Sequence, residues 1–463
     1  MPAFWLAKPG TFRDDSQIPS WSVVAMNPSP VVCLRIFVPF AFGYFLSYLY
    51  RTVNAVLAPD LVRDLALDPA GLGLLTSAYF LAFALAQLPV GILLDRFGPR
   101  RVEAGLLLFA AAGALLFARA ATLGELLAGR ALIGLGVAAC LMAAFKAFTE
   151  WFPREQLPFV NGIQMVSGGM GALAATAPVE LALTITGWRG VFILLAGLTL
   201  VAALGVFALV PERRRAGPGE GVGRQLAGVA EVFSSRTFWR LTPWAVAAQG
   251  AYLSLVGLWA GPWLRDVAGC SRLEVANALM GVAGAMVVGY FVFGTVAARL
   301  GRRGIPAARV AAVGMAAFLA TQGLLILQPA GPAVVLWLLF GFCGTACILP
   351  YAVLSQQFPA RLAGRVNAGL NLLVFLMAFA AQWGVGAVLG HWPATAAGGY
   401  APDGYRWGFG LLAGLQLAGM AWYLAARRAA GSGGWRGGQG RADDAGVVAQ
   451  EGGADGGAQR QAG

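Results

Sequence analysis

Two arginines lie inside long apolar segments, where an ionised side chain needs a specific role. Arg51 lies about six residues past the middle of the run 33–57, and Arg130 lies about six residues before the middle of the run 124–148. If both runs cross a membrane as antiparallel helices, the rise of about 1.5 Å per residue places both guanidinium groups roughly 9 Å from the midplane. No carboxylate lies at the same depth in these segments, so the pair favours an anionic ligand, which the planar guanidinium fork suits. The alternative is that each arginine bonds backbone carbonyls and stiffens the bundle.

A second group of residues lies between two apolar runs and repeats glycine and arginine at short intervals. Its members are Gly91, Asp95, Arg96, Gly98, Arg100 and Arg101. The glycines allow two helices to approach and turn sharply, the aspartate can accept hydrogen bonds at a helix end, and the arginines can anchor at headgroup level. We expect this segment to control how two helices meet. The alternative is a solvated loop whose charges only set its orientation.

The composition indicates which elements position these residues. Of 463 residues, 58% are apolar and only 12% are charged, against about 45–50% and about 25% in soluble domains. The mean hydropathy is +0.69. A soluble protein cannot cover so much apolar surface, so we predict an all-α integral membrane protein.

Several other classes of protein are excluded by the same sequence. The net charge of +12 does not indicate a nucleic-acid partner, because the Lys and Arg residues lie in short clusters between apolar runs. The five cysteines and the single His391 lack metal-ligand spacing, and no nucleophile, base or metal cluster lies near a membrane interface. We therefore expect no enzyme activity, no metal and no cofactor.

Apolar runs of about 20 residues predict twelve transmembrane helices. They lie roughly at 33–57, 71–94, 102–120, 124–148, 160–183, 189–210, 241–263, 276–298, 307–327, 332–354, 366–390 and 406–426. They divide into two six-helix bundles, at 31–210 and 241–427. Residues 211–240 are expected to form a linker whose second part is an amphipathic helix on the membrane surface. Residues 1–30 and 428–463 read as tails, and the second has a disordered composition.

The distribution of charge predicts the orientation. One side of the predicted membrane, with both tails and the linker, holds 23 Lys and Arg residues, and the opposite side holds six. Because positive residues collect on the cytoplasmic side, we expect a multi-pass protein of the cell inner membrane with both termini in the cytoplasm. Residues 1–30 lack the regions of a signal peptide, and Met26 is an alternative start of translation.

The two predicted bundles repeat one another in sequence. The segment 91–101 returns as 294–303 with Gly, Arg, Gly and Arg at the same offsets, and the Phe-Pro pair at 152–153 returns at 358–359. In the second copy Ala298 replaces the aspartate, so we expect that copy to contribute less to the control of how two helices meet. A duplicated six-helix unit makes two pseudo-symmetric bundles, which enclose a cavity at their interface and rock against each other during transport.

These features resemble the Major Facilitator Superfamily over residues 31–427. The motif at 91–101 matches that family's signature between the second and third spans, and Arg130 begins a match to its fourth-span signature R-x-x-x-G-x-G. The resemblance implies a secondary transporter with two six-helix bundles. It also implies that Asp95 and Arg96 help to hold the outward-facing arrangement, as a latch at the cytoplasmic ends of the helices.

Residues 43–55 of the first predicted span resemble the first span of the organophosphate:phosphate antiporters and the related anion:cation symporters. There an arginine in this place faces the central cavity and binds the anion, which implies that role for Arg51 and a neighbouring place for Tyr48. The antiporters' second arginine and their histidine are missing here, so a monoanion such as a carboxylate fits better than a sugar phosphate. The fifth and seventh spans also line the cavity in the family. They add the substrate-binding candidates Gln164, Gln249 and Tyr252 to Arg51, Tyr48 and Arg130.

We therefore expect a secondary transporter for a small organic anion, acting as a monomer in the lipid bilayer. Import of an anion against a negative interior needs a proton or a counter-anion. The acidic residues, with Glu103 among them, are placed near loops or span ends, and none lies at the midplane. Two alternatives stay open. One is an efflux pump for amphipathic drugs or siderophores, favoured by Trp259 and Trp263, and the other is a transporter-like sensor that binds a solute and signals through a partner.

Overall fold

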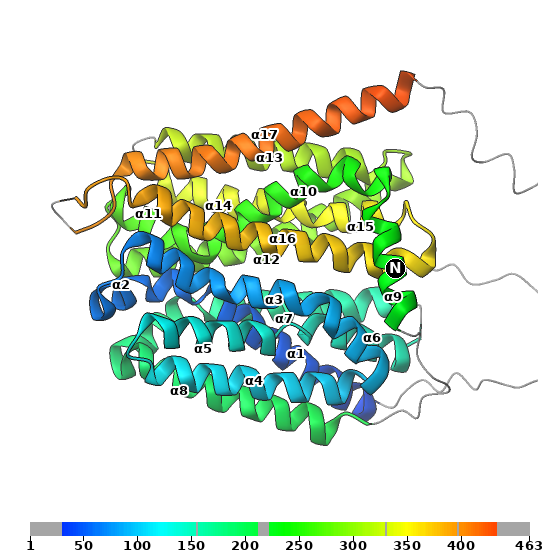
Figure 1. Cartoon of the computed structure of the whole chain (residues 1–463), viewed down its shortest axis with the longest axis horizontal. Helices are drawn as coiled ribbons and strands as arrows, with labels where there is room; N and C mark the ends of the chain where they lie inside the picture. The colour runs from blue at the N-terminus through cyan, green and yellow to red at the C-terminus, as the bar shows by residue number, and fades with distance from the viewer. Residues whose placement is uncertain (1–29, 154–155, 212–221, 329–330, 396–397, 433–463) are drawn as a thin grey trace, which may run out of the picture.

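The computed structural model describes residues 30–153, 156–211, 222–328, 331–395 and 398–432. Most of the predicted tails and residues 212–221 of the predicted linker lie outside the described residues. Figure 1 shows two layers of long helices that run side by side, one from each half of the chain. The described residues contain helices and no strands, as apolar segments in a membrane require.

The N-terminal bundle is built from eight helical segments. They are α1 (Pro30–Thr52), α2 (Asn54–Leu65), α3 (Pro69–Phe97), α4 (Pro99–Arg119), α5 (Leu123–Gly136), α6 (Cys140–Trp151), α7 (Leu157–Ala174) and α8 (Ala177–Leu209). The segment α8 contains Gly187 at φ +64°, where the helix breaks. The fifth predicted span therefore corresponds to α7 with the start of α8, and the sixth to the rest of α8.

The C-terminal half begins with a short helix and continues as the second bundle. Its elements are α9 (Val222–Phe233), α10 (Arg236–Ser254), the π-helix η1 (Leu255–Trp259), α11 (Ala260–Asp266), α12 (Arg272–Arg302), α13 (Ala307–Leu327), α14 (Ala333–Gly344), the 3-10 helix η2 (Thr345–Ile348), α15 (Leu349–Ser355), α16 (Ala360–Leu389) and α17 (Pro402–Ser432). Several predicted spans are thus broken helices.

Helix length and composition confirm the prediction of an all-α membrane protein. Within the described residues, nine helices are long and apolar enough to cross a membrane, and the pair α1 and α2, bent by 47°, makes up to ten. The two other predicted spans correspond to α7 with the start of α8, and to α10, η1 and α11. The order of the helices is consistent with twelve spans in two bundles.

The two ends of the bundles carry different elements. The start of α1, the end of α17 and the helix α9 lie at one end, which we call the linker end (Figure 1). The helices α2 and α11 lie at the opposite end, which we call the distal end. The predicted amphipathic stretch is helical in α9, which packs on α16: Arg361 donates to both carboxylate oxygens of Glu231, at 2.7 and 2.9 Å. These hydrogen bonds lower the pKa of Glu231 from its ordinary value.

The bundles meet most closely along α3 and α16. A β-carbon on Gly73 of α3 would lie 2.8 Å from the carbonyl oxygen of Gln382 on α16, so only glycine permits this approach. One turn away, the Gln382 side chain donates a hydrogen bond of 3.0 Å to Thr76. Small residues at a membrane helix interface allow backbones to pack directly, and a buried hydrogen bond adds to that contact.

Candidate functional site

A central cavity of about 100 Å³ lies between the two bundles. A water molecule needs about 10–15 Å³ by this measure, so the cavity has room for several waters or one small solute. Both bundles supply polar side chains to its lining. They are Tyr44, Ser47, Tyr48, Arg51, Gln87, Gln249, Tyr290, Tyr351 and Asn371. The remaining walls are apolar, as is usual for small-molecule sites.

One face of α1 carries much of the polar lining. Tyr44, Ser47, Tyr48 and Arg51 recur at the spacing of one helix face. The Arg51 guanidinium lies 4.6 Å from the ring centroid of Tyr48, and 5.3 and 5.1 Å from two phenylalanine rings. Its Nε is buried without a hydrogen-bond partner, and no acidic side chain of the described chain forms an ion pair with it.

The rings around Arg51 come from both bundles. Phe83 lies on α3 and Phe375 on α16, and their own centroids are 4.3 Å apart. Aromatic faces attract a cation weakly, by about 0.5–2 kcal/mol, and they do not neutralise it. The cavity therefore presents a positive charge in mainly apolar surroundings, with hydroxyl and amide groups within the same lining.

A chain of hydrogen bonds crosses from one bundle to the other beside this charge. Asn371 on α16 donates to Gln87 Oε1 on α3 at 2.8 Å, and Tyr351 on α15 donates to Asn371 Oδ1 at 2.9 Å. Gln87 lines both the central cavity and a crevice of about 340 Å³ at the linker end. Gln249 also faces the central cavity, where its Oε1 is buried without a partner.

The structure places Arg130 in different surroundings from Arg51. Arg130 is completely buried within the N-terminal bundle and is not among the residues that line the central cavity. It donates a hydrogen bond of 3.1 Å to the carbonyl oxygen of Tyr50, and its guanidinium lies 4.9 and 5.3 Å from the rings of Phe117 and Phe192. This contact to a backbone carbonyl is the alternative stated above for an arginine in a span.

Two other predicted candidates also lie outside the cavity lining. Gln164 is buried and donates to the carbonyl oxygen of Phe40 at 3.1 Å, which ties α7 to α1. Tyr252 lines a separate cavity of about 30 Å³ with Thr52 of α1. Of the six predicted substrate-binding residues, the central cavity therefore brings together Tyr48, Arg51 and Gln249.

Several lining residues were not predicted. Tyr44 lies one turn before Tyr48 on the same helix face, so the spacing within α1 could have identified it. Tyr290 on α12 and Tyr351 on α15 had no such signal, because their place in the lining depends on how the bundles pack.

The predicted latch residues connect helices of the N-terminal bundle. Asp95 at the end of α3 forms an ion pair with Lys146 on α6, and both line the crevice at the linker end. Arg100 lies 4.8 Å from the ring centroid of Phe207 on α8. Gly98 has φ +86°, which favours glycine, and it is the cap between α3 and α4. Of the other motif residues, Gly91 lines the same crevice, and Arg96 and Arg101 are exposed.

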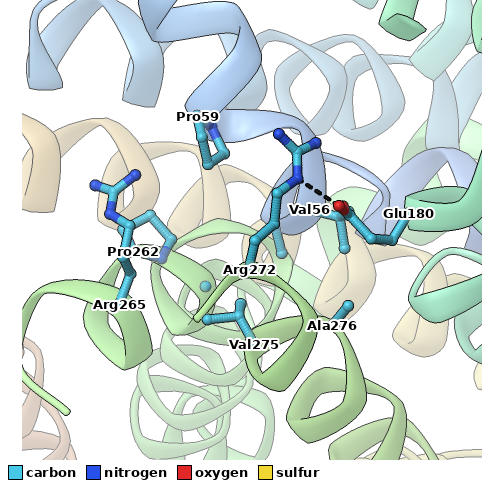
Figure 2. A pocket seen from close by; sticks show the side chains of 10 residues that line it. Val56, Pro59, Glu180, Pro262, Arg265, Arg272, Val275 and Ala276 are labelled. Atoms are coloured by element: carbon cyan, nitrogen blue, oxygen red, sulfur yellow. Dashed lines mark hydrogen bonds and ion pairs between the residues drawn. The ribbon is translucent and has the colours of Figure 1, made fainter. Parts of the chain in front are cut away.

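The distal end carries an ionic contact between the two bundles. Arg272 at the start of α12 donates to both oxygens of Asp60 on α2, at 3.1 and 2.5 Å, and to Glu180 on α8. Figure 2 shows its guanidinium directed from α12 toward Glu180. We call these three residues the distal clasp. The Asp60 and Glu180 side chains are only 9% and 10% exposed, and that of Arg272 is 42% exposed.

Comparison with known proteins agrees with this architecture. The chain is 32% identical over 158 residues to a probable sulfoacetate transporter of Cupriavidus necator, covering 34% of this chain and 36% of the relative. It is 30% identical over 165 residues to the hexuronate transporter of Escherichia coli strain K12, covering 35% and 38%. The matched stretches thus span less than half of these relatives.

The fold also matches solved structures. A bacterial homologue of the human lysosomal transporter Spinster, in an inward-facing and unoccupied conformation, superposes with a TM-score of 0.70 at 19% identity, over 87% of this chain and 98% of that one. The sequence model of the Major Facilitator Superfamily matches residues 40–382. The chain therefore belongs to the Major Facilitator Superfamily.

Proposed function

We propose that this protein is a secondary transporter that carries a small organic anion through the central cavity by alternating access. The observation that carries the proposal is the Arg51 guanidinium, which lines the cavity with a buried, unpartnered Nε and no carboxylate partner among the described residues. A buried guanidinium that lacks an anionic partner is stabilised strongly by an anion that reaches it.

The other cavity groups favour a solute with one anionic group and additional hydroxyl or carbonyl oxygens. Tyr48 and Gln249 line the cavity beside a single arginine, whereas Arg130 contacts a backbone carbonyl outside the lining. One guanidinium matches the charge of one carboxylate or sulfonate. Transporters with sulfoacetate and hexuronate in their names are among the relatives of this chain, which supports the anion:cation symporter branch.

We assign the linker end to the cytoplasm, because positive residues concentrate there. In this orientation the clasp closes the periplasmic end, while the crevice at the linker end lies next to the central cavity. The structure then corresponds to an inward-facing state. Transport requires a second state in which the clasp is broken and the linker end is closed.

Counterflow in proteoliposomes tests this function. Vesicles with the purified full-length protein are loaded with unlabelled sulfoacetate or D-galacturonate, and the entry of the same labelled anion is measured, with uncharged D-galactose as the control. We expect exchange of at least one anion and none of the neutral sugar. Exchange of galactose alone would contradict the proposal, and anion binding without any exchange would indicate a solute sensor.

A further inference from the structure

A buried carboxyl group in the N-terminal bundle has no role in the site described above. Glu103 is expected from the sequence to lie near a loop, and the structure shows it in the second turn of α4 with a completely buried side chain. Neither carboxylate oxygen has a hydrogen-bond partner, and no cation of the described chain pairs with it. An ionised carboxylate in such surroundings costs several kcal/mol. This place therefore suits the neutral acid, with a proton on one oxygen.

The neighbouring helices leave space for this group. The Glu103 carboxylate lies against Gly43 on α1, where the β-carbon of any other residue would overlap Oε1. The sulfur of Cys140 on α6 would lie 3.8 Å from the same added β-carbon. Glycine at position 43 thus creates the pocket into which the acid fits.

The other charged groups on these helices have different contacts. The thiol of Cys140 lies on the same side of Gly43 as Glu103. Tyr44 on α1 donates to a methionine sulfur, and Lys146 on α6 forms an ion pair with an aspartate. Arg100 on α4 itself lies over a phenylalanine ring of α8. None of these groups neutralises Glu103 in this state.

The residues beside Glu103 adjoin residues that line the central cavity. Tyr44 follows Gly43 in the sequence, Leu141 follows Cys140, and both line that cavity together with Arg51. An anion that neutralises Arg51 removes a positive charge from the same bundle, which favours the protonated form of a nearby acid. Linkage is reciprocal, so the proton in turn favours the anion.

We propose that Glu103 is the proton-binding residue that couples a proton to the transported anion. The proposal rests on the proposed function. The acid holds its proton while this pocket is closed, and it exchanges the proton with water when the change between the two states opens the pocket. One proton and one monoanion then cross together without net charge, so that the negative membrane potential does not oppose import.

Infrared spectroscopy of the purified full-length protein tests the proton site without any substrate. Wild type, Glu103→Gln and the control Asp403→Asn, which removes an exposed acid at the start of α17, are compared at neutral pH. We expect the carbonyl band of a protonated carboxylic acid in wild type and in Asp403→Asn, and its loss in Glu103→Gln. Identical spectra in this region for all three proteins would overturn the proposal.

Transport by the same proteins tests the coupling. With the monoanion D-galacturonate as the probe, Glu103→Gln is expected to reduce accumulation driven by a pH gradient by about tenfold or more, while counterflow stays within about twofold. Accumulation at the wild-type level would overturn the coupling role. If wild type does not move this anion, that role fails together with the proposed function, while the infrared band still decides whether Glu103 binds a proton.

Discussion

Replacement of Arg272 by glutamine should shift the protein toward the state that is open at the distal end. The side chain donates two hydrogen bonds to Asp60, at 3.1 and 2.5 Å, and one to Glu180. Hydrogen bonds to charged groups contribute about 1.5–3 kcal/mol when buried, but Arg272 is 42% exposed. With solvent screening we expect about 1–3 kcal/mol for the clasp. That shifts the equilibrium between the two states by about 5- to 150-fold.

The loss of Arg272 also leaves the poorly solvated Glu180 without its cation, although Asp60 keeps its ion pair to Arg63, and this further disfavours the closed distal end. The assay is the rate at which a membrane-impermeant maleimide labels Ala276→Cys, in a protein whose five native cysteines are replaced by serine. Ala276 is 1% exposed and lines a separate cavity of about 200 Å³, whose walls include Glu180 and Arg272 of the clasp.

We expect the labelling rate of the Arg272→Gln protein to be about 5- to 150-fold higher than that of the same protein with Arg272 in place. The matched control is Arg406→Gln, which removes an exposed arginine whose ion pair to Asp403 lies within α17. It should leave the rate unchanged. An Arg272→Gln protein that labels at the control rate would refute the clasp as the closure of the distal end.

Three further substitutions test other parts of the structure. Gly134→Ala places a β-carbon against the carbonyl of Tyr79, and this overpacking should destabilise the protein by about 1–3 kcal/mol and lower its melting temperature. The control Gly124→Ala adds a β-carbon that meets nothing within 4 Å, so the melting temperature should not change. Arg130→Gln removes a hydrogen bond to a backbone carbonyl, so calorimetry should show lower stability and unchanged anion affinity. Unchanged stability with reduced anion affinity would place Arg130 in the binding site. Asp95→Asn should slow counterflow but leave the equilibrium affinity for the anion within a few-fold, because the residue biases a conformational equilibrium. An affinity loss as large as that of an Arg51 variant would refute the latch.

Helix positions could be predicted from the sequence because a membrane imposes a minimum apolar length on each span. The breaks within the spans could not. The bend of 47° after Thr52 and the π-helix at 255–259 lie where α2 and η1 meet, and a β-carbon on Gly261 would overlap the carbonyl of Ala55. Such breaks depend on contacts between the bundles. The hydropathy of one segment carries no information about these contacts.

The same reason explains which site residues were predictable. Sequence spacing gives the depth of a residue and its face on its own helix, which suffices for Arg51 and Tyr48 on α1. It does not say what a face packs against, so Arg130, at a similar predicted depth, faces the interior of one bundle. The burial of Glu103 likewise depends on Gly43 of another helix.

The most direct test of the central proposal is the affinity of Arg51→Gln for the transported anion. Isothermal titration calorimetry with sulfoacetate or D-galacturonate, and a melting curve on the same preparation, are compared with wild type. We expect unchanged melting and an affinity loss of about 2–4 kcal/mol, roughly 30- to 900-fold, because the bound anion is left desolvated and unpaired. Normal affinity with a lowered melting temperature would contradict the proposal and show that Arg51 only stabilises the bundle.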